Sequence, residues 1–157
     1  MSIHIVLYQP LIPPNTGNIA RTCAGTHSSL HLIRPLGFST DDRQLKRAGL
    51  DYWPSVDIHY YDDLDDFFTN NQGGELYLVE TDGSRPYTQF DYSDPEKNYY
   101  FIFGKETTGL PKPFIKAHQD RCIRLPMTDK IRSLNLSNSA AIIVYEALRQ
   151  QNFPGLS

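Results

Sequence analysis

The chain has 157 residues, a formal net charge of −3 and 39% hydrophobic residues, which fits one domain with a buried core and excludes a two-lobed enzyme. The longest apolar runs are too short to cross a membrane, and the first ten residues lack a signal-peptide pattern, so we expect a cytoplasmic protein. The two cysteines lie far apart and the five histidines form no ligand spacing, so neither a disulfide framework nor a metal site is predicted.

Runs rich in β-branched and aromatic residues alternate with helical segments along the chain. Strands are expected at 3–8, 30–34, 56–61, 75–80, 99–104 and 121–126, and helices at 16–27, 41–49, 62–70, 112–118 and 137–150. This alternation predicts a single α/β domain, residues 1–157, with a mainly parallel sheet flanked by helices. Asp41 and Asp42 favour the start of the second helix, and Pro111 and Pro113 suit the first turn of the fourth.

Three loops that follow predicted strands have unusual compositions. They are QPLIPPNTGNIART after the first strand, FGKETTGLP at 103–111 and LPMTDKIRSLNLSN at 125–138. Ligands bind beyond the carboxyl ends of the strands in open parallel sheets, so we expect the chemistry here. In the first loop, residues 15–18 are expected to open a helix with exposed N–H donors. In the second, Gly104 and Gly109 permit close backbone approach, and Glu106 is the only carboxylate.

The common nucleotide-binding and hydrolase motifs are missing from the sequence. Neither GxGxxG nor GxxxxGK[ST] occurs, so a standard dinucleotide or triphosphate site is not supported. No GxSxG elbow occurs, and the serines near the last helix lack a local base, which argues against a serine hydrolase. The net charge argues weakly against a nucleic-acid partner, although basic residues gather in two segments.

The three loops together resemble the signature motifs of the SPOUT superfamily of S-adenosylmethionine-dependent RNA methyltransferases. The matching segments are NTGNIAR (15–21), FGKETTGLP (103–111) and LPM…RSLNLSN (125–138), in the same order. The opening IVLYQPLIPPNTGN and the segment KRAGLDY (46–52) look like the minimal tRNA 2′-O-methyltransferases of this superfamily that modify the wobble nucleotide, the TrmL or YibK type. The resemblance covers essentially the whole chain and implies a C-terminal trefoil knot, a homodimer and a tRNA substrate.

The resemblance also implies a cofactor site for S-adenosylmethionine among the three loops. Its residues would be Val79, Glu80, Thr81, Gly104, Gly109, Leu125, Met127, Ser133, Leu134 and Asn135. Apolar side chains with backbone polar groups can hold adenine without charged side chains. Purely structural roles are the alternative to cofactor binding. Gly104 can simply end a strand, Leu125 can pack in the core, and Asn135 or Ser137 can cap the last helix. We expect Gly104→Val to block cofactor binding and leave the fold intact.

The resemblance assigns the reacting ribose hydroxyl to the neighbourhood of Arg21. Because arginine is not deprotonated in proteins, we expect Arg21 to bind a phosphate or the developing alkoxide, while a nearby carboxylate or the RNA phosphate takes the proton. Asn18 would fix Arg21 or the loop, and Glu106 would orient the second loop or lie near the sulfonium. The ordinary alternative is a surface ion pair between Arg21 and an acidic side chain.

Two further surfaces are expected to bind partners. Phosphate contacts would come from Arg43, Lys46, Arg47 and Arg132. The last helix is apolar on two faces: one row would cover the sheet, and Ile142 and Tyr145 would meet a second copy of the chain. Two alternatives remain open: a non-catalytic RNA-binding module of the same fold, and a SPOUT methyltransferase that acts on another RNA site.

Overall fold

The computed structural model describes residues 2–39, 41, 43–49, 52–82 and 85–157. Its strands are β1 (Ile3–Tyr8), β2 (Ser29–Ile33), β3 (Ile58–Tyr61), β4 (Glu75–Val79), β5 (Arg85–Pro86), β6 (Tyr99–Phe103) and β7 (Cys122–Arg124). Its helices are α1 (Pro13–Thr26), α2 (Arg43–Gly49), α3 (Leu64–Asn70), α4 (Lys112–Ala117) and α5 (Leu136–Gln150), with short 3-10 turns η1 (Trp53–Ser55), η2 (Tyr87–Gln89) and η3 (Gln119–Arg121).

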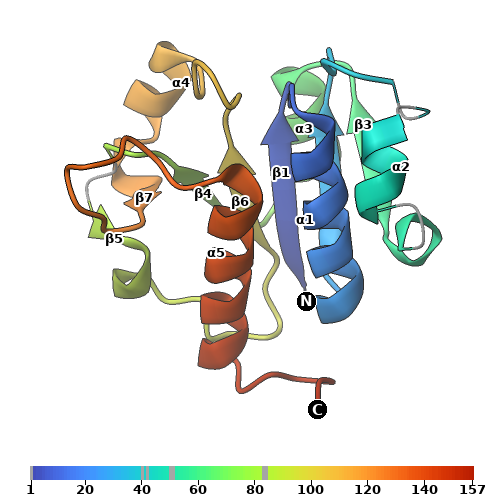
Figure 1. Ribbon diagram of the computed structural model, residues 1–157. Coiled ribbons are helices and arrows are strands. Elements are labelled where there is room, and N and C mark those ends of the chain that lie inside the picture. The colour runs from blue at the N-terminus through green and yellow to red at the C-terminus, as the bar shows by residue number, and fades with distance from the viewer. Residues whose placement is uncertain (1, 40, 42, 50–51, 83–84) are drawn as a thin grey trace.

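The strands form one sheet in the order β3-β2-β1-β6-β4-β7-β5, and each neighbouring pair is parallel. The α/β class and the parallel sheet predicted from the sequence are therefore confirmed. Buried residues of α1 and α5 pack on one face of the sheet, while α3 and α4 pack on the other. Figure 1 shows α1 and α5 in front of the strands, with α2 beside α1.

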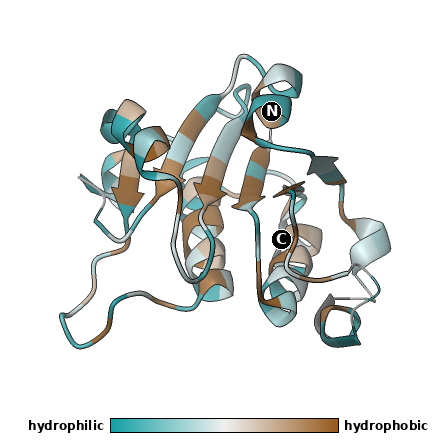
Figure 2. Ribbon diagram, turned by 90° about the horizontal axis from the view of Figure 1, so that it is seen from above, coloured by the Kyte–Doolittle hydropathy of each residue, from teal (hydrophilic) through white to brown (hydrophobic). Residues whose placement is uncertain are grey.

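The apolar residues of the strands explain why helices pack on both faces of the sheet. The strand patterns are buried almost without interruption in β2 and β6, as expected for a parallel sheet with helices on both faces. Side chains alternate between the faces: Ile5 and Leu7 face the α1 and α5 side, whereas Val6 faces α3 and α4. Figure 2 shows the apolar colour concentrated on the central strands, with hydrophilic loops around them.

The first helix differs from its prediction. It begins at Pro13, three residues before the predicted start, because the two prolines fit the first helical positions, where no intrahelical N–H bond is needed. The backbone N–H groups of Asn15 and Thr16 both donate to the Ile12 carbonyl oxygen, at 3.1 and 3.5 Å. The prediction that residues 15–18 open the helix with exposed N–H donors is therefore wrong.

Other boundaries agree with the sequence within a few residues. The strand predicted at 56–61 begins at Ile58, and the one predicted at 121–126 ends at Arg124. Strand β5 has only two residues and was not predicted. Pro111 and Pro113 lie at the N-cap and second position of α4, as expected. Helix α2 begins near its predicted start, while the start residue Asp42, and Leu50 and Asp51 of the KRAGLDY segment, lie outside the described residues.

Candidate functional site

The sheet order brings the three motif loops to one edge. Strands β1, β6, β4 and β7 are consecutive neighbours, and their carboxyl ends point the same way because all are parallel. The loop after β1 leads into α1, the loop after β6 leads into α4, and the loop after β7 leads into α5. Segments more than 90 residues apart in the sequence therefore meet at the carboxyl edge of the sheet.

Glu106 connects the second motif loop to the first. Its carboxylate accepts a hydrogen bond from the Leu11 backbone N–H at 2.8 Å and a longer one from Ile12 at 3.4 Å. Both donors lie in the turn that precedes α1, where backbone N–H groups lack intrahelical partners. Glu106 was expected to orient the second loop or to lie near the sulfonium; its hydrogen bonds instead tie the second loop to the approach of α1.

Gly104 and Gly109 allow the second loop to fold back on itself. Lys105 and Gly109 exchange backbone hydrogen bonds, with N···O distances of 3.3 and 3.0 Å, and Gly109 has a φ of +72°. A Cβ on Gly104 would collide with backbone atoms of Gly109 and Leu110. The expectation that Gly104→Val leaves the fold intact is wrong, because any side chain here displaces the loop itself.

Glu80 lies under the same loop, directly after β4. Its carboxylate accepts a hydrogen bond from the Leu110 N–H at 3.3 Å, and a Cβ on Gly109 would lie 3.7 Å from both of its oxygens. Burial raises the pKa of the Glu80 carboxyl, and the nearby Asp82 adds to this rise while the Leu110 N–H opposes it. Glu80 therefore supports the backbone of the second loop from below.

The third loop supplies apolar side chains and the start of α5. Leu125 is buried, while Met127 and Leu134 are half-buried against the main core. Ser133 is exposed. Asn135 is the N-cap of α5: its side-chain oxygen accepts hydrogen bonds from the backbone N–H groups of residues 137 and 138, at 2.9 and 3.4 Å. The capping role that the sequence left open is therefore confirmed.

Asn135 also reaches the first motif. Its side-chain nitrogen donates to the Asn15 side-chain oxygen at 3.1 Å, and Asn15 is only 6% exposed. This contact joins the first turn of α1 to the beginning of α5, 120 residues later in the sequence. Sequence reasoning treated Asn15 only as part of a helix start. The helical periodicity of α1 places Asn15 on the buried face. A polar side chain at a buried position is the signal that could have identified Asn15.

Arg21 and Asn18 lie on the exposed side of α1, one turn apart. The Arg21 guanidinium carbon lies 5.1 Å from the centre of the Tyr52 ring, a cation–π distance. Among the ion pairs of the described residues, none includes Arg21. The surface ion pair considered as the ordinary alternative for Arg21 is therefore not formed within that part of the chain.

The basic residues expected to bind RNA lie in two regions. Helix α2 packs against α1 and exposes Arg43, Lys46 and Arg47. The Lys46 Nζ lies 3.9 Å from Asp41 Oδ1. Arg132 is exposed on the loop before α5. Figure 1 places α2 and this loop on opposite sides of the molecule. Within one copy of the chain, these four side chains do not form a single patch.

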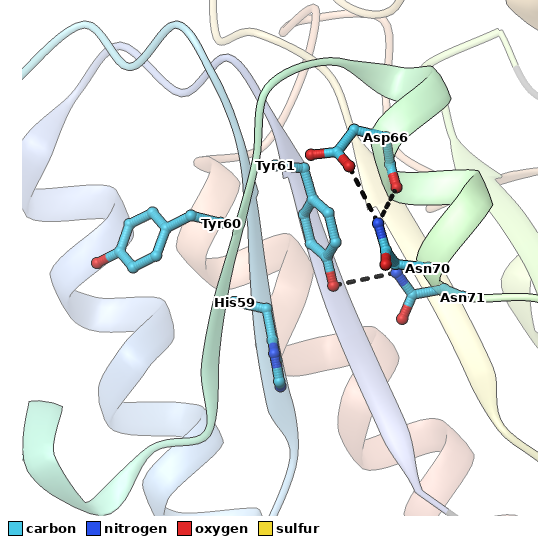
Figure 3. Close-up of a pocket in the computed structure, with 6 residues that line it drawn as sticks. All are labelled: His59, Tyr60, Tyr61, Asp66, Asn70 and Asn71. Carbon is cyan, nitrogen blue, oxygen red and sulfur yellow. Dashed lines mark hydrogen bonds between the residues drawn. The ribbon is translucent and has the colours of Figure 1, made fainter.

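A separate hollow of about 460 Å³ lies between β3 and α3. Figure 3 shows the side chains that line it: His59, Tyr60, Tyr61, Asp66, Asn70 and Asn71. Four of these, Tyr61, Asp66, Asn70 and Asn71, are joined by hydrogen bonds, including a 3.0 Å bond from the Asn71 amide to the Tyr61 hydroxyl. None of the lining residues belongs to the three motifs, so the hollow is not part of the candidate site.

Neither membrane nor metal features occur in the described part of the chain. No helix formed by those residues has the length and apolar character needed to span a membrane. No group of three or more histidine, cysteine, aspartate or glutamate side chains within the same residues could hold a metal ion.

Comparison with known proteins identifies the relatives of this fold. A protein of Geobacillus stearothermophilus, whose name is that of a tRNA (cytidine(34)-2′-O)-methyltransferase, is 65% identical over 157 residues and is matched over 100% of both chains. A solved structure on the 2-OH methylation of C/U34 on tRNA has a TM-score of 0.89 and 39% identity, covering 96% of this chain and 97% of the other.

The fold also extends to more distant methyltransferases. A structure of AviRb from Streptomyces viridochromogenes in complex with AdoMet has a TM-score of 0.81 at 22% identity, covering 96% of this chain and 61% of the other, which shows the shared fold alone. Residues 2–145 match the model of the SpoU rRNA Methylase family. With most of its length matched by that model, the chain belongs to the SpoU rRNA Methylase family.

Proposed function

We propose that this protein transfers a methyl group from S-adenosylmethionine to the ribose 2′-hydroxyl of the wobble nucleotide of tRNA, a cytidine or modified uridine at position 34. The observation that carries the proposal is the double attachment of α1, the helix that bears Arg21. Glu106 holds the turn before α1, and Asn135 holds Asn15 within it. The relative from Geobacillus and the solved structure on C/U34 methylation support the same substrate and atom.

The residues at the carboxyl edge fit S-adenosylmethionine by their chemistry. The second loop, with Gly104 and Gly109, presents backbone polar groups. Apolar side chains come from Val79, Leu125, Met127 and Leu134. A flat adenine ring with polar edges is well matched by such a mixture. When bound, the cofactor supplies the methyl group. We assign Ser133 and Asn135, at the start of α5, and Glu80, beneath the second loop, to the border of this site.

Arg21 provides positive charge where the substrate carries negative charge. Its guanidinium fork suits a phosphate or the alkoxide that develops on the ribose oxygen, and arginine keeps its proton at all working pH values. Alignment of the two reactants supplies much of the rate in an in-line methyl transfer. Asn18, one turn earlier on the same exposed side, lies beside this group on α1.

Glu106 acts as a positioning residue in this proposal. Its two carboxylate oxygens already accept hydrogen bonds from Leu11 and Ile12, so the charge serves the loop before α1. A carboxylate held in this way is a poor candidate for the group that removes the hydroxyl proton. The RNA phosphate next to the target nucleotide is then the acceptor that we favour.

The RNA surface and the dimer belong to the same proposal. On α5, Ala140, Ile143 and Ala147 are fully buried against the sheet, whereas Ile142 and Tyr145 are 37% and 49% exposed. A second copy of the chain that covers Ile142 and Tyr145 would form a homodimer. The basic residues of α2 and Arg132 lie apart in one copy, so two copies together offer a broader phosphate-binding surface.

Three finer features of the family remain part of the proposal. The C-terminal trefoil knot, in which the loops after β6 and β7 are threaded, is an expectation from the SPOUT resemblance. We treat residues 1–157 as one methyltransferase domain. A tRNA-modifying activity places the protein in the cytoplasm, where its substrate is.

Nucleoside analysis tests the proposed function directly. Purified protein, methyl-labelled S-adenosylmethionine and unmodified tRNA should yield a labelled 2′-O-methylated nucleoside at position 34. A tRNA carrying deoxyribose at this nucleotide should bind and accept no label. Label on a base atom, or on a ribose elsewhere in tRNA or rRNA, would assign a different SPOUT reaction. Binding without any methyl transfer would support a non-catalytic module.

A further inference from the structure

Tyr52 holds Arg21 through its aromatic ring. The Arg21 guanidinium carbon lies 5.1 Å from the centre of the ring, and Arg21 makes no ion pair within the described residues. A ring attracts a guanidinium through its negative face and takes none of its N–H donors. A carboxylate at the same place would occupy two donors and cancel the charge. The contact thus fixes the side chain and leaves its charge available.

The ring is itself held by the segment between α2 and β3. The Tyr52 carbonyl oxygen accepts a hydrogen bond from Ser55 at 2.9 Å, which closes the η1 turn. The next residue, Trp53, packs against the main hydrophobic core, as does Val56 at the end of the turn. Both η1 and α2 pack along α1. Tyr52 therefore approaches Arg21 from a segment that is anchored to the core.

Two other arginines that lie over a tyrosine ring each share their charge with a carboxylate. Arg34 lies 5.1 Å from the Tyr60 ring and also pairs with Asp62 at 3.5 Å. Arg121 lies 5.2 Å from the Tyr77 ring and also pairs with Glu75 at 2.9 Å. In both pairs, a carboxylate shares the guanidinium. Within the described residues, Arg21 has the ring without a carboxylate, and so does Arg85, which lies 4.0 Å from the Phe90 ring. Arg21 differs from Arg85 because it lies on the helix of the first motif, where its charge is available to an external anion.

We propose that Tyr52 is a positioning residue for the methyl-transfer reaction, which holds the Arg21 guanidinium over its ring so that all the N–H donors face the tRNA ribose–phosphate. This inference rests on the proposed function of Arg21. Tyr52 itself touches neither reactant in this proposal. Its effect on the reaction passes entirely through Arg21.

Three variants and a double variant test the positioning role. Tyr52→Leu removes the ring and should lower kcat roughly two- to fivefold, which corresponds to the strength of an exposed cation–π contact. The KM for the cofactor should stay unchanged. Tyr52→Phe keeps the ring face and should restore parental kcat. In an Arg21→Ala background, adding Tyr52→Leu should cause no further loss. Arg121→Ala, the matched control at the amino end of β7, should keep parental kcat.

A spectroscopic measurement gives a second result that does not depend on activity. The Arg21 Nε–H proton should carry an upfield ring-current shift in the parental protein and in Tyr52→Phe, and lose it in Tyr52→Leu. If the parental protein transfers no methyl group to tRNA, the proposed function fails, while this shift still decides whether Tyr52 holds Arg21.

Three results would overturn the positioning role. One is an unchanged Arg21 signal in Tyr52→Leu. Another is a further loss of kcat when Tyr52→Leu is added to Arg21→Ala. The last is a higher KM for tRNA with unchanged kcat in Tyr52→Leu, because the ring would then bind RNA directly.

Discussion

Arg21 combines an exposed position with a side chain that no carboxylate of the described chain neutralises. We predict that Arg21→Ala lowers the rate of methyl transfer at least about a hundredfold, the scale on which a positioned charge-stabilising group acts. Cofactor affinity, measured by calorimetry, should stay near the parental value. Methyl incorporation at the parental rate would remove Arg21 from the reaction.

His31 is a buried titratable residue far from the motif loops. It is 2% exposed, its Nε2 lies 2.8 Å from His4 Nδ1, and its Nδ1 lies 2.7 Å from the Tyr61 hydroxyl. Burial lowers its pKa to about 3, and the neighbouring His4 and His59 add to this, while Asp57 opposes it. The Tyr100 ring also contacts it. His31 is therefore neutral in the folded protein at ordinary pH.

The lowered pKa of His31 predicts an acid-sensitive fold. Between the unfolded pKa near 6.5 and the folded value of about 3, the unfolded chain binds more protons, so the free energy of unfolding falls as pH falls. The slope for this residue is at most about 1.4 kcal/mol per pH unit. His31→Gln should flatten the profile measured by urea unfolding, and His27→Asn, at the exposed end of α1, should not. Equal profiles for the parent and His31→Gln would contradict this prediction.

Several residue contacts could not be predicted from the sequence. Glu106 meets Leu11 across 95 residues, and Asn135 meets Asn15 across 120. A local pattern reports which face of a helix is buried, but it does not report which distant side chain will lie opposite. The family resemblance assigned Glu106 and Asn135 to one candidate site. Only the three-dimensional structure shows the hydrogen bonds of Glu106 and Asn135. The same holds for the Tyr52 ring beside Arg21.

At the scale of elements, the loop after β6 depends on backbone packing. We predict that Gly104→Ala lowers both the free energy of unfolding and the affinity for S-adenosylmethionine, since its Cβ collides with the backbone of Gly109 and Leu110. The matched control is Gly25→Ala in α1, where a Cβ meets no atom within 4 Å. There, alanine should stabilise the helix by about 0.5–1 kcal/mol.

Urea unfolding and calorimetry on both variants separate these effects. A Gly104→Ala protein with parental stability and lost cofactor affinity would mean that Gly104 faces the cofactor directly. That outcome would restore the sequence-based interpretation of this glycine.

The elements themselves were largely predictable because their signals are local. Continuous apolar runs identified β1, β2, β4 and β6, and prolines identified the start of α4. Helix α1 begins earlier than the predicted residue 16 because the fixed φ of Pro13 and Pro14 suits the first helical turn. The two-residue strand β5 has no sequence pattern of its own, since it is defined by its pairing with β7.

At the scale of the whole molecule, the exposed side of α5 predicts self-association. Burying Ile142 and Tyr145 would contribute ~1.5–3 kcal/mol for each side chain that is fully covered, and a two-fold interface applies the gain twice. Ile142→Arg should shift the protein toward monomer and lower tRNA methylation, because a charge would enter an apolar contact. Ile142→Val, the conservative control, should remain dimeric.

Sedimentation at micromolar concentration measures this shift. A parental protein that sediments as a monomer, or an Ile142→Arg dimer with normal methylation, would mean that α5 does not form the subunit contact. The exposed Ile142 and Tyr145 would then need another partner.

The sheet order has a consequence for how the chain emerges during synthesis. Strand β1 lies between β2 and β6, so one of its edges pairs with residues 29–33 and the other with residues 99–103. At about 5–20 residues per second, the ribosome needs roughly 4–14 s to add the 70 residues that separate the ends of these two partners. Throughout that interval the nascent protein presents an apolar strand with an open edge, the kind of surface on which neighbouring chains aggregate. The N-terminal third of this protein is therefore the segment that chaperones have most reason to shield.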